Sequence, residues 1–381
     1  MKKRKITVTT GTRADYGLLR PVLNKIKSNK NLDLILIVTG MHLSKKYGLT
    51  INEIKKDGFK IYDSFNMIPK ENSKYLLSEM LGKSIINFSK VFEKIKPDIN
   101  LVLGDRDEML ASSLAAYHMN IPNAHIHGGD KSGGIDEYTR HAITKISNIH
   151  FAPSLKSKTR ILKMGEDPKY VFFTGSPAID EVRDSKITSK KTLEDKYDFK
   201  FSGKDILLLQ HPVTTQVEDT KNQIKYLLES IKKINQPTIA ICSNSDAGSN
   251  IIFKNLEKFS KSNSSFILFK SLPRFDYLGM LKNCKVLTGN SSSGIIEASY
   301  FRIPVVDIGI RQNNREKGPN VLHAENSIVS IHSKLVKALK IKKQDLLTAS
   351  IYGNGNAGNK IVKYLETIKI DQTLIEKQIS Y

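Results

Sequence analysis

The feature that most constrains this chain is a regular alternation of short apolar runs and helix-like segments, which continues through most of its length. Residues 6–10 (ITVTT) form a β-branched run, residues 18–28 have the spacing of an amphipathic helix, and residues 32–40 form a second apolar run. Apolar runs of this kind are typical of strands that are buried on both faces. The pattern therefore predicts parallel sheets with helices packed on both sides.

The alternation occurs in two successive series, which indicates two domains. The chain has 381 residues, 39% of them hydrophobic, and this length suits two cores better than one. A polar stretch at residues 184–205 has the character of a linker or an exposed surface. We expect two Rossmann-like, doubly wound domains, residues 1–175 and 176–355. From similar folds, we also expect a C-terminal helix at about residues 356–381 to pack back onto the first domain.

Polar, glycine-rich segments follow the predicted strands. They are GTR, TGMH, GDRDE, HIHGGD, QHPVTT, NSDAG and GNSSSG, in chain order. Open α/β sheets bind ligands at the carboxyl ends of their strands, which is where these segments fall. If the two predicted domains face each other, the segments line one cleft and form a single active site.

Residues 289–298 (GNSSSGIIEA) carry the clearest signal for a phosphate group. We expect the backbone N–H groups of Ser291, Ser292 and Gly294 to point outward at the start of a helix, whose dipole favours a diphosphate. Glu297 would lie one turn inside that helix, where its carboxylate can accept hydrogen bonds from ribose hydroxyls. The alternative is a serine-rich helix cap. No GxxxxGK[ST] or GxGxxG motif occurs, which disfavours a P-loop nucleotidase or a standard dinucleotide enzyme.

Three cationic or titratable side chains near predicted strand ends are further candidates for binding a phosphate. Arg13 and Arg311 lie where a guanidinium can form two parallel bonds to an anion. His211 directly follows an apolar run, and Pro212 fixes the turn after it, so that the imidazole can donate to a phosphate or titrate near neutral pH. The alternatives are surface arginines beside turns and a hydrogen-bonded structural histidine.

Acidic and histidine side chains gather after two other predicted strands. Asp105 ends an apolar strand, where it is a candidate acid or base or, alternatively, the N-cap of the next helix. The segment at residues 125–141 is dense in titratable groups: His125, His127, Asp130, Asp136, Glu137, Arg140 and His141. His125 and His127 have no third ligand at a standard spacing, so we predict no metal site here. Mixed charges among glycines suit acid–base chemistry better.

The formal net charge of +22 raises the hypothesis of nucleic-acid binding. The lysines are spread along the whole chain, however, and no RNP signature, zinc finger or interleaved basic–aromatic block occurs. We therefore predict no nucleic-acid partner and expect part of the positive field to attract a diphosphate substrate. No apolar run approaches the ~18 residues of a membrane span, and the N-terminus lacks a signal-peptide core, so we expect a cytoplasmic protein without a membrane partner.

Six segments resemble the UDP-N-acetylglucosamine 2-epimerase family in the family's own order, over nearly the whole chain. They are TGTRADYG, TGMHLSKKYG, GDRDEMLA, HIHGGDKSGGIDEYTRHAITK, HPVTT and GNSSSGIIE. The HIHGGDKSGG segment is similar to the hydrolysing branch, whereas non-hydrolysing relatives have HVEAGLR-like loops. The resemblance implies two Rossmann-like domains facing a cleft in the GT-B arrangement.

The same resemblance implies roles for individual residues. It implies catalytic roles for Asp105, Asp136 and His42. In some members of the branch His127 is replaced by a catalytic glutamate, so the base at C2 stays open, with His127 and Asp130 as further candidates. The positions that match nucleotide- or diphosphate-binding residues are Arg13, Arg106, Arg140, His211, Ser291, Ser292, Glu297 and Arg311.

The activity that the resemblance implies is hydrolysing epimerisation of UDP-N-acetylglucosamine to N-acetylmannosamine and UDP, as in sialic-acid biosynthesis, by elimination to a glycal and hydration. This chemistry requires neither NAD nor a metal, so we predict no cofactor. The alternatives are UDP-N,N'-diacetylbacillosamine as substrate, a non-hydrolysing epimerase, a GT-B glycosyltransferase, and an RNA-binding protein suggested by the charge alone. Related enzymes imply a homodimer or a higher homo-oligomer.

Overall fold

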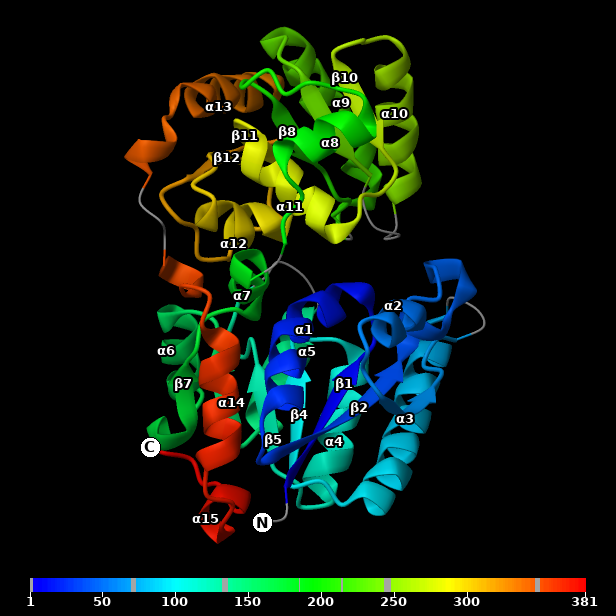
Figure 1. The fold of residues 1–381 in the computed structure, drawn as a ribbon, viewed down its shortest axis with the longest axis vertical. Helices are drawn as coiled ribbons and strands as arrows, with labels where there is room; N and C mark the ends of the chain where they lie inside the picture. Colours follow the sequence, from blue (N-terminus) through cyan, green and yellow to red (C-terminus); the bar gives the residue numbers. More distant parts are fainter. Residues whose placement is uncertain are drawn as a thin grey trace. The chain divides into compact units, whose positions relative to one another are not determined.

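The computed structural model describes residues 3–69, 73–131, 136–184, 186–213, 215–242, 248–346 and 350–381. These residues form two compact units. Unit 1 comprises the described residues up to Lys131, those from Asp136 to Glu181, and Tyr352–Tyr381, whereas unit 2 comprises those from Val182 to Ile351. Each unit is a sheet flanked by helices, as the ribbon shows (Figure 1).

The sheet of unit 1 has the strand order β3-β2-β1-β4-β5-β6-β7 among the described residues, and every recorded pairing is parallel. Its strands are β1 (Arg4–Thr10), β2 (Leu32–Thr39), β3 (Ile61–Phe65), β4 (Ile99–Leu103), β5 (Asn123–Ile126), β6 (Ile149–Ala152) and β7 (Val171–Phe173). The order reverses between β1 and β4, which marks the point where doubly wound sheets bind their ligands.

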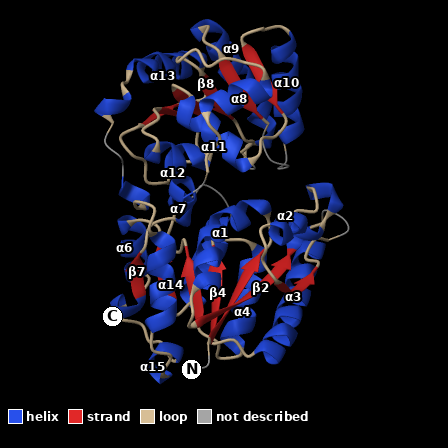
Figure 2. Cartoon of the chain, viewed as in Figure 1, coloured by secondary structure: helices blue, strands red, loops and turns tan. Residues whose placement is uncertain are grey.

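Helices cover both faces of this sheet (Figure 2). The helices of unit 1 are α1 (Arg13–Ser28), α2 (Ile51–Lys56), α3 (Lys74–Ile95), α4 (Asp107–His118), α5 (Asp136–Ile146), α6 (Leu155–Lys163), α14 (Ala357–Thr367) and α15 (Gln372–Ile375), with 3-10 turns η1 (Gly40–Leu43), η2 (Lys45–Tyr47) and η3 (Pro168–Tyr170). Helix α7 (Pro177–Asp184) and the 3-10 turn η6 (Ser350–Tyr352) span the two boundaries between the units. Along β2, Leu36 and Val38 pack into the core that includes α1 and α14, whereas Ile35 and Ile37 pack into the core with α3 and α4. Burial on both faces explains why the strand is apolar without alternation.

The C-terminal part of the chain belongs to unit 1. Helix α14 packs beside α1, and its Ile361 and Leu365 are fully buried in the same core as Leu19 of α1. After α15, Lys377 donates to Glu166 Oε2 (2.6 Å) and to the carbonyl oxygens of Lys145, in α5, and of Ser147. Burial opposes the charge of Glu166, but its bonds to His150 and Lys377 outweigh this effect and lower the pKa of its carboxyl to about 2.

Unit 2 repeats the same architecture. Its described strands are ordered β10-β9-β8-β11-β12-β13 and the recorded pairings are again parallel. The strands are β8 (Ile206–Leu209), β9 (Thr238–Ile241), β10 (Phe266–Phe269), β11 (Val286–Gly289), β12 (Val305–Ile308) and β13 (Val321–Ala324). The helices are α8 (Lys190–Tyr197), α9 (Thr220–Ile234), α10 (Ser249–Lys261), α11 (Arg274–Asn283), α12 (Ser292–Tyr300) and α13 (Ile328–Lys340), with 3-10 turns η4 (Val217–Asp219) and η5 (Lys343–Asp345).

Two details differ from the sequence-based organisation. Unit 1 continues past the expected boundary at residue 175 to Glu181, and strand β7 pairs with β6 and completes its sheet. The polar stretch at residues 184–205 contains α8, whose Leu193 is fully buried against the core that also includes Leu278 of α11. The Tyr197 ring packs against the same core, and most other side chains of α8 are charged, so this part of the stretch is a surface helix rather than a linker. Among the described residues, no helix has the length and apolar character needed to cross a membrane.

Candidate functional site

In unit 1, candidate residues lie at the carboxyl ends of β1, β4 and β5, around the reversal of strand order. The turn after β1 is fixed by a reciprocal cap at the start of α1. Thr12 Oγ1 accepts from the backbone N–H of Asp15 (3.3 Å), and the Asp15 carboxylate accepts from the backbone N–H of Thr12 (2.9 Å). This capping box holds the turn that carries Arg13.

The Asp15 carboxyl is buried beneath this turn, with Glu108 close by. Burial raises the pKa of Asp15 to about 6, although hydrogen bonds from Thr10 and Thr12 favour its charged form, and the neighbouring Glu108 raises it further. The Glu108 side chain packs against the backbone of Gly40, where φ is +59°. A Cβ at residue 40 would collide with Glu108 Oε1. Only glycine therefore fits at residue 40.

His42 is fully buried and hydrogen-bonded through both ring nitrogens. Its Nε2 lies 3.0 Å from Thr10 Oγ1, and its Nδ1 lies 2.7 Å from Thr50 Oγ1. The Thr10 hydroxyl donates to the Asp15 carboxylate, so it can only accept from His42, which places the imidazole proton on Nε2. Burial lowers the pKa of His42 to about 4. The His42 imidazole thereby joins the turn after β2 to the end of β1 and to Thr50, before α2.

His125 on β5 is a second buried, neutral histidine. Its Nε2 lies 2.7 Å from the carbonyl oxygen of Gly104, so it donates there, and Nδ1 lies 3.2 Å from Thr144 Oγ1. Burial lowers the pKa of His125 to about 3. Its bond to Gly104 ties β5 to the turn that presents Asp105. Among the described residues, no cluster of three or more His, Cys, Asp or Glu side chains has an arrangement suited to a metal ion.

These buried histidines predict that the protein loses stability in mild acid. Below the unfolded pKa of about 6.5, the unfolded chain takes up protons that folded His42 and His125 do not, so stability falls as the pH is lowered. Asp15 opposes this, because its raised pKa lets the folded state bind a proton first. Between pH 7 and pH 5 we expect a net loss of about 2 to 3 kcal/mol. Urea unfolding at both pH values measures this loss, and Asp15→Asn should make it larger. A free energy of unfolding that is equal at pH 7 and pH 5 would contradict the prediction.

Asp105, at the end of β4, forms an ion pair with Arg140 of α5. The Asp105 side chain is 25% exposed, whereas that of Arg140 is 4% exposed, so the pair joins a buried cation to an accessible carboxylate. Arg140 Nη1 also donates to the carbonyl oxygen of Asp130 (3.1 Å). One guanidinium thus fixes the strand end that carries Asp105 relative to the HIHGGD loop. Because the N-cap of α4 is Arg106, Asp105 does not cap this helix.

The loop after β5 places His127 and Asp130 in the same region. His127 has a φ of +67°, which is unusual for a non-glycine residue and is typical of functional sites. Its Nε2 lies 2.9 Å from Ser176 Oγ, a residue that the sequence analysis did not single out. The Asp130 side chain accepts from the backbone N–H of Lys131 (3.0 Å) and is almost fully buried. Asp136 is the first residue of α5, and its side chain lies outside the described part of the structure.

The two remaining candidates of unit 1 are arginines with acidic partners. Arg13 is exposed at the start of α1, with its Nε 3.3 Å from Glu53 Oε2. Arg106 Nε lies 3.2 Å from Glu108 Oε2, and its side chain is 41% exposed. The Arg13–Glu53 pair is exposed on both sides and contributes little to stability, so Arg13 can turn toward an anion. The Glu108 carboxylate is only 7% exposed, so Arg106 is paired with a buried acid.

In unit 2, the reversal of strand order lies between β8 and β11, and Asn290 is the residue that joins the loops there. Its Oδ1 accepts from the backbone N–H of His211 (2.7 Å), and its Nδ2 donates to the carbonyl oxygen of His211 (2.8 Å). Its own carbonyl oxygen accepts from Arg311 Nη1 and Gln312 Nε2, each at 3.0 Å. The sequence analysis missed this role, although Asn290 stands inside the GNSSSG segment.

Helix α12 starts beside this junction. Ser291 is its N-cap and accepts from the backbone N–H of Ser293 (3.3 Å), and Ser292 is its first residue. The prediction for the Gly294 N–H is wrong, because this group donates to the carbonyl oxygen of Ser291 (3.1 Å) rather than pointing outward. Helix α12 packs closely against β12 at Gly294, because a Cβ there would lie only 2.9 Å from Val305 Cγ1. Glu297, one turn later, is paired with Arg274, which the sequence analysis also missed.

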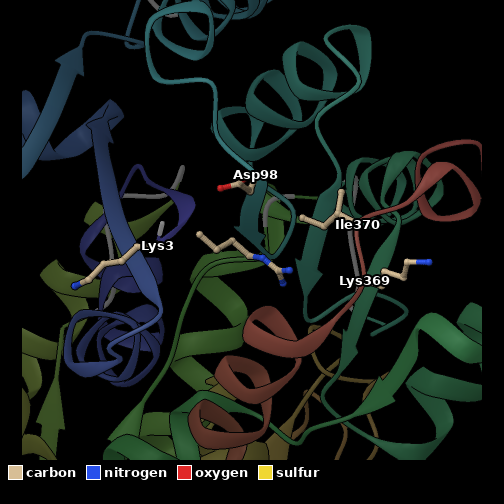
Figure 3. Close-up of a pocket in the computed structure, with 5 residues that line it drawn as sticks. Lys3, Asp98, Lys369 and Ile370 are labelled. Atoms are coloured by element: carbon tan, nitrogen blue, oxygen red, sulfur yellow. The ribbon is translucent and has the colours of Figure 1, made fainter. Parts of the chain in front are cut away.

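A depression of about 430 Å³ opens in unit 1 away from these loops. Figure 3 shows Lys3, Asp98, Lys369 and Ile370 around it. It lies at the amino-terminal start of β1, whereas ligands of parallel sheets bind at the carboxyl ends of the strands. The depression is therefore not the candidate site.

Comparisons with known proteins agree with this architecture. A family model described as UDP-N-acetylglucosamine 2-epimerase matches residues 24–366. The UDP-N,N'-diacetylbacillosamine 2-epimerase (hydrolyzing) of Legionella pneumophila is 37% identical to this chain, covering 99% of the chain and 100% of the relative. The GDP/UDP-N,N'-diacetylbacillosamine 2-epimerase (hydrolyzing) of Campylobacter jejuni is 36% identical, covering 98% of each.

A solved structure supports the fold. The crystal structure of UDP-GlcNAc 2-epimerase from Neisseria meningitidis, bound to UDP-GlcNAc, matches with a TM-score of 0.81 and 22% identity, covering 95% of this chain and 99% of that one. This likeness and the two parallel sheets confirm the predicted doubly wound α/β fold. Since the family model covers most of the chain and the relatives align along almost all of it, the chain belongs to the UDP-N-acetylglucosamine 2-epimerase family.

Proposed function

We propose that this protein is a hydrolysing 2-epimerase whose substrate is UDP-N,N'-diacetylbacillosamine. The observation that carries the proposal is the identity of 36% to 37%, over almost the whole chain, with two relatives named for this activity. This changes the order given by the sequence analysis, which put UDP-N-acetylglucosamine first. The latter stays the second candidate, because the matching family model bears its name.

The proposed reaction has two stages. In the first, a base takes the proton from C2 while the C1–O bond breaks, so that UDP leaves with the bonding electrons and a C1=C2 double bond forms. In the second, water adds its oxygen to C1, and a proton is delivered to C2 on the face opposite to the one from which the first proton left. The products are UDP and the free sugar with inverted C2. The reaction is redox-neutral and consumes one water.

We assign proton transfer in this reaction to Asp105 and Asp136, with Asp130 or His127 sharing the role of base or acid at C2. The accessible carboxylate of Asp105 and the buried guanidinium of Arg140 behind it support this assignment. A carboxylate fixed by an arginine keeps its orientation toward a substrate, which proton transfer requires. For His42 we propose a positioning role instead of the catalytic role implied by the resemblance, because it is fully buried and both ring nitrogens have partners.

We assign binding of the UDP group to the accessible cations Arg13 and Arg106, to the buried cation Arg140, and to the loops around Asn290. The candidates are Arg13, Arg106, Arg140, His211, Ser291, Ser292, Glu297 and Arg311. Preorganised donors stabilise the charge that develops on the departing diphosphate, and losing one costs on the order of 10²- to 10³-fold in rate. The cytoplasmic location and the homo-oligomeric state stay predictions.

Separate incubation with the two UDP-sugars tests the substrate assignment. We expect UDP and the free 2-epimer of N,N'-diacetylbacillosamine, with kcat/KM at least about tenfold above that for UDP-N-acetylglucosamine, because a site built for the C4 acetamido group leaves polar partners unpaired with a hydroxyl. A reversed preference would favour the second candidate. Accumulation of UDP-linked 2-epimer without free sugar would contradict the hydrolysing activity.

A further inference from the structure

Four polar side chains of unit 2 form one connected network between α11 and α12. Arg274 Nη2 pairs with Glu297 Oε1, and Ser293 Oγ donates to Glu297 Oε2 (2.5 Å). The Tyr277 hydroxyl is hydrogen-bonded to Ser293 Oγ, and the guanidinium carbon of Arg274 lies 5.6 Å from the centre of the Tyr277 ring. The four residues therefore form a closed ring of contacts around the Glu297 carboxylate.

The direction of each hydrogen bond in the network follows from the inventory of protons. An ionised carboxylate can only accept hydrogen bonds, so Ser293 donates its single hydroxyl proton to Glu297. Toward Tyr277, Ser293 can then only accept, and the Tyr277 hydroxyl must donate. The Glu297 side chain is 8% exposed and is held at both oxygens, one by Arg274 and one by Ser293. Its orientation is therefore fixed before any ligand arrives.

Arg274 starts from a rigid position. It is the first residue of α11, and Asp276 two residues later is buried and accepts from Thr188 Oγ1 (2.5 Å), Lys196 Nζ (2.6 Å) and Tyr197 Oη (2.6 Å). These bonds tie the first turn of α11 to α8 and to the segment before it. A guanidinium on a helix end held in this way can restrain its partner, because little side-chain freedom is left.

We propose that Arg274 is a positioning residue that orients Glu297 to recognise the ribose diol of the UDP group. The inference rests on the proposed function, in which Glu297 binds the nucleotide. Each carboxylate oxygen has two acceptor positions, and the network uses one on each, so that one acceptor per oxygen is left. A vicinal diol presents two hydroxyl donors side by side and matches this pair. Arg274 acts through Glu297 and does not itself contact the ribose.

The test compares the affinities of UDP, 2′-deoxy-UDP and 3′-deoxy-UDP by titration calorimetry. The variants are Arg274→Met, Arg274→Lys, Glu297→Gln and the double variant that combines Arg274→Met with Glu297→Gln. The control is Arg183→Met, which removes an exposed ion pair with Asp184 on α7. Thermal unfolding verifies that each variant is folded, and Arg274→Lys keeps the test open if the methionine variant is not.

We expect the wild type to prefer UDP over the weaker deoxy analogue by on the order of tenfold or more, since the bond lost is to a charged acceptor. Arg274→Met should lose most of this preference, Arg274→Lys should keep part of it, and the double variant should be no worse than Glu297→Gln. Equal weakening of all three nucleotides by Arg274→Met, additive effects in the double variant, or no preference in the wild type would overturn the proposal.

The outcome is separable from the test of the proposed function. Nucleotide preference is measured without turnover, so it does not depend on which sugar is the substrate. A protein that prefers UDP through Arg274 and Glu297 but does not turn over either UDP-sugar would contradict the proposed activity and still support the role of Arg274.

Discussion

Replacing Asp105 by Asn is expected to lower kcat for release of the free sugar by on the order of 10³-fold, with little change in the affinity for UDP. Asparagine has the shape of aspartate and can still accept a hydrogen bond from Arg140, but it cannot take up the C2 proton. Nucleotide affinity should persist, because the proposed contacts with UDP lie largely in unit 2. Steady-state turnover and UDP calorimetry on the same preparation measure both quantities.

The control for this substitution is Asp33→Asn, which makes the same chemical change at an exposed residue of β2. Unfolding must be followed as well, because Asp105→Asn leaves the buried Arg140 without its anionic partner, and an uncompensated buried charge is costly. A folded Asp105→Asn protein with a near-normal turnover would remove Asp105 from the proton-transfer steps. A parallel loss of UDP affinity in a folded protein would instead indicate that the change displaces Arg140, its partner in the ion pair.

Replacing Asn290 by Ala is expected to weaken UDP binding by on the order of 10²-fold. The substitution removes both side-chain bonds to the backbone of His211, 79 residues away, where the N–H and the carbonyl oxygen are partly buried. Losing the two hydrogen bonds costs about 1 to 3 kcal/mol in all, and part of this cost falls on the loops that are proposed to bind the diphosphate. Calorimetry with UDP measures the loss.

The matched control is Asn255→Ala on α10, where the side chain donates only to a carbonyl oxygen one turn earlier, at 2.8 Å. Asn290→Asp adds a sharper comparison. It keeps the acceptor for the His211 N–H but replaces the donor to the His211 carbonyl oxygen by a repelling oxygen. We expect the Asn290→Asp variant to bind UDP no more tightly than the alanine variant does. Affinities within twofold of wild type for both variants would refute the bracing role of Asn290.

The fold could be predicted largely from the sequence, because buried parallel strands are apolar without alternation and are followed by polar, glycine-rich turns. What failed depends on information that a local pattern does not contain. The pattern does not fix the boundary of unit 1, which extends to Glu181 rather than ending at residue 175. Helix α8 was missed because Leu193 is its one fully buried residue and most of its other side chains are charged.

The candidate site was predicted as a set of loops, but not as a set of contacts. Asp105 and Arg140 were both singled out, yet their pairing across 35 residues follows only from the neighbouring positions of β4 and β5. Asn290 and Arg274 were missed because their partners lie far away in the sequence. His42 was singled out from its motif, and its burial between two threonine hydroxyls, which only the structure gives, is the basis of the positioning role that we propose.

The most direct test of the central claim is NMR of the purified protein with UDP-N,N'-diacetylbacillosamine in D₂O. The proposed mechanism predicts UDP and the free 2-epimeric sugar, with deuterium at C2 of the product, because the C2 proton leaves in the first stage and a solvent deuteron returns in the second. Free sugar with unchanged C2 configuration and no deuterium would indicate simple hydrolysis of the UDP-sugar and would contradict the elimination and hydration mechanism.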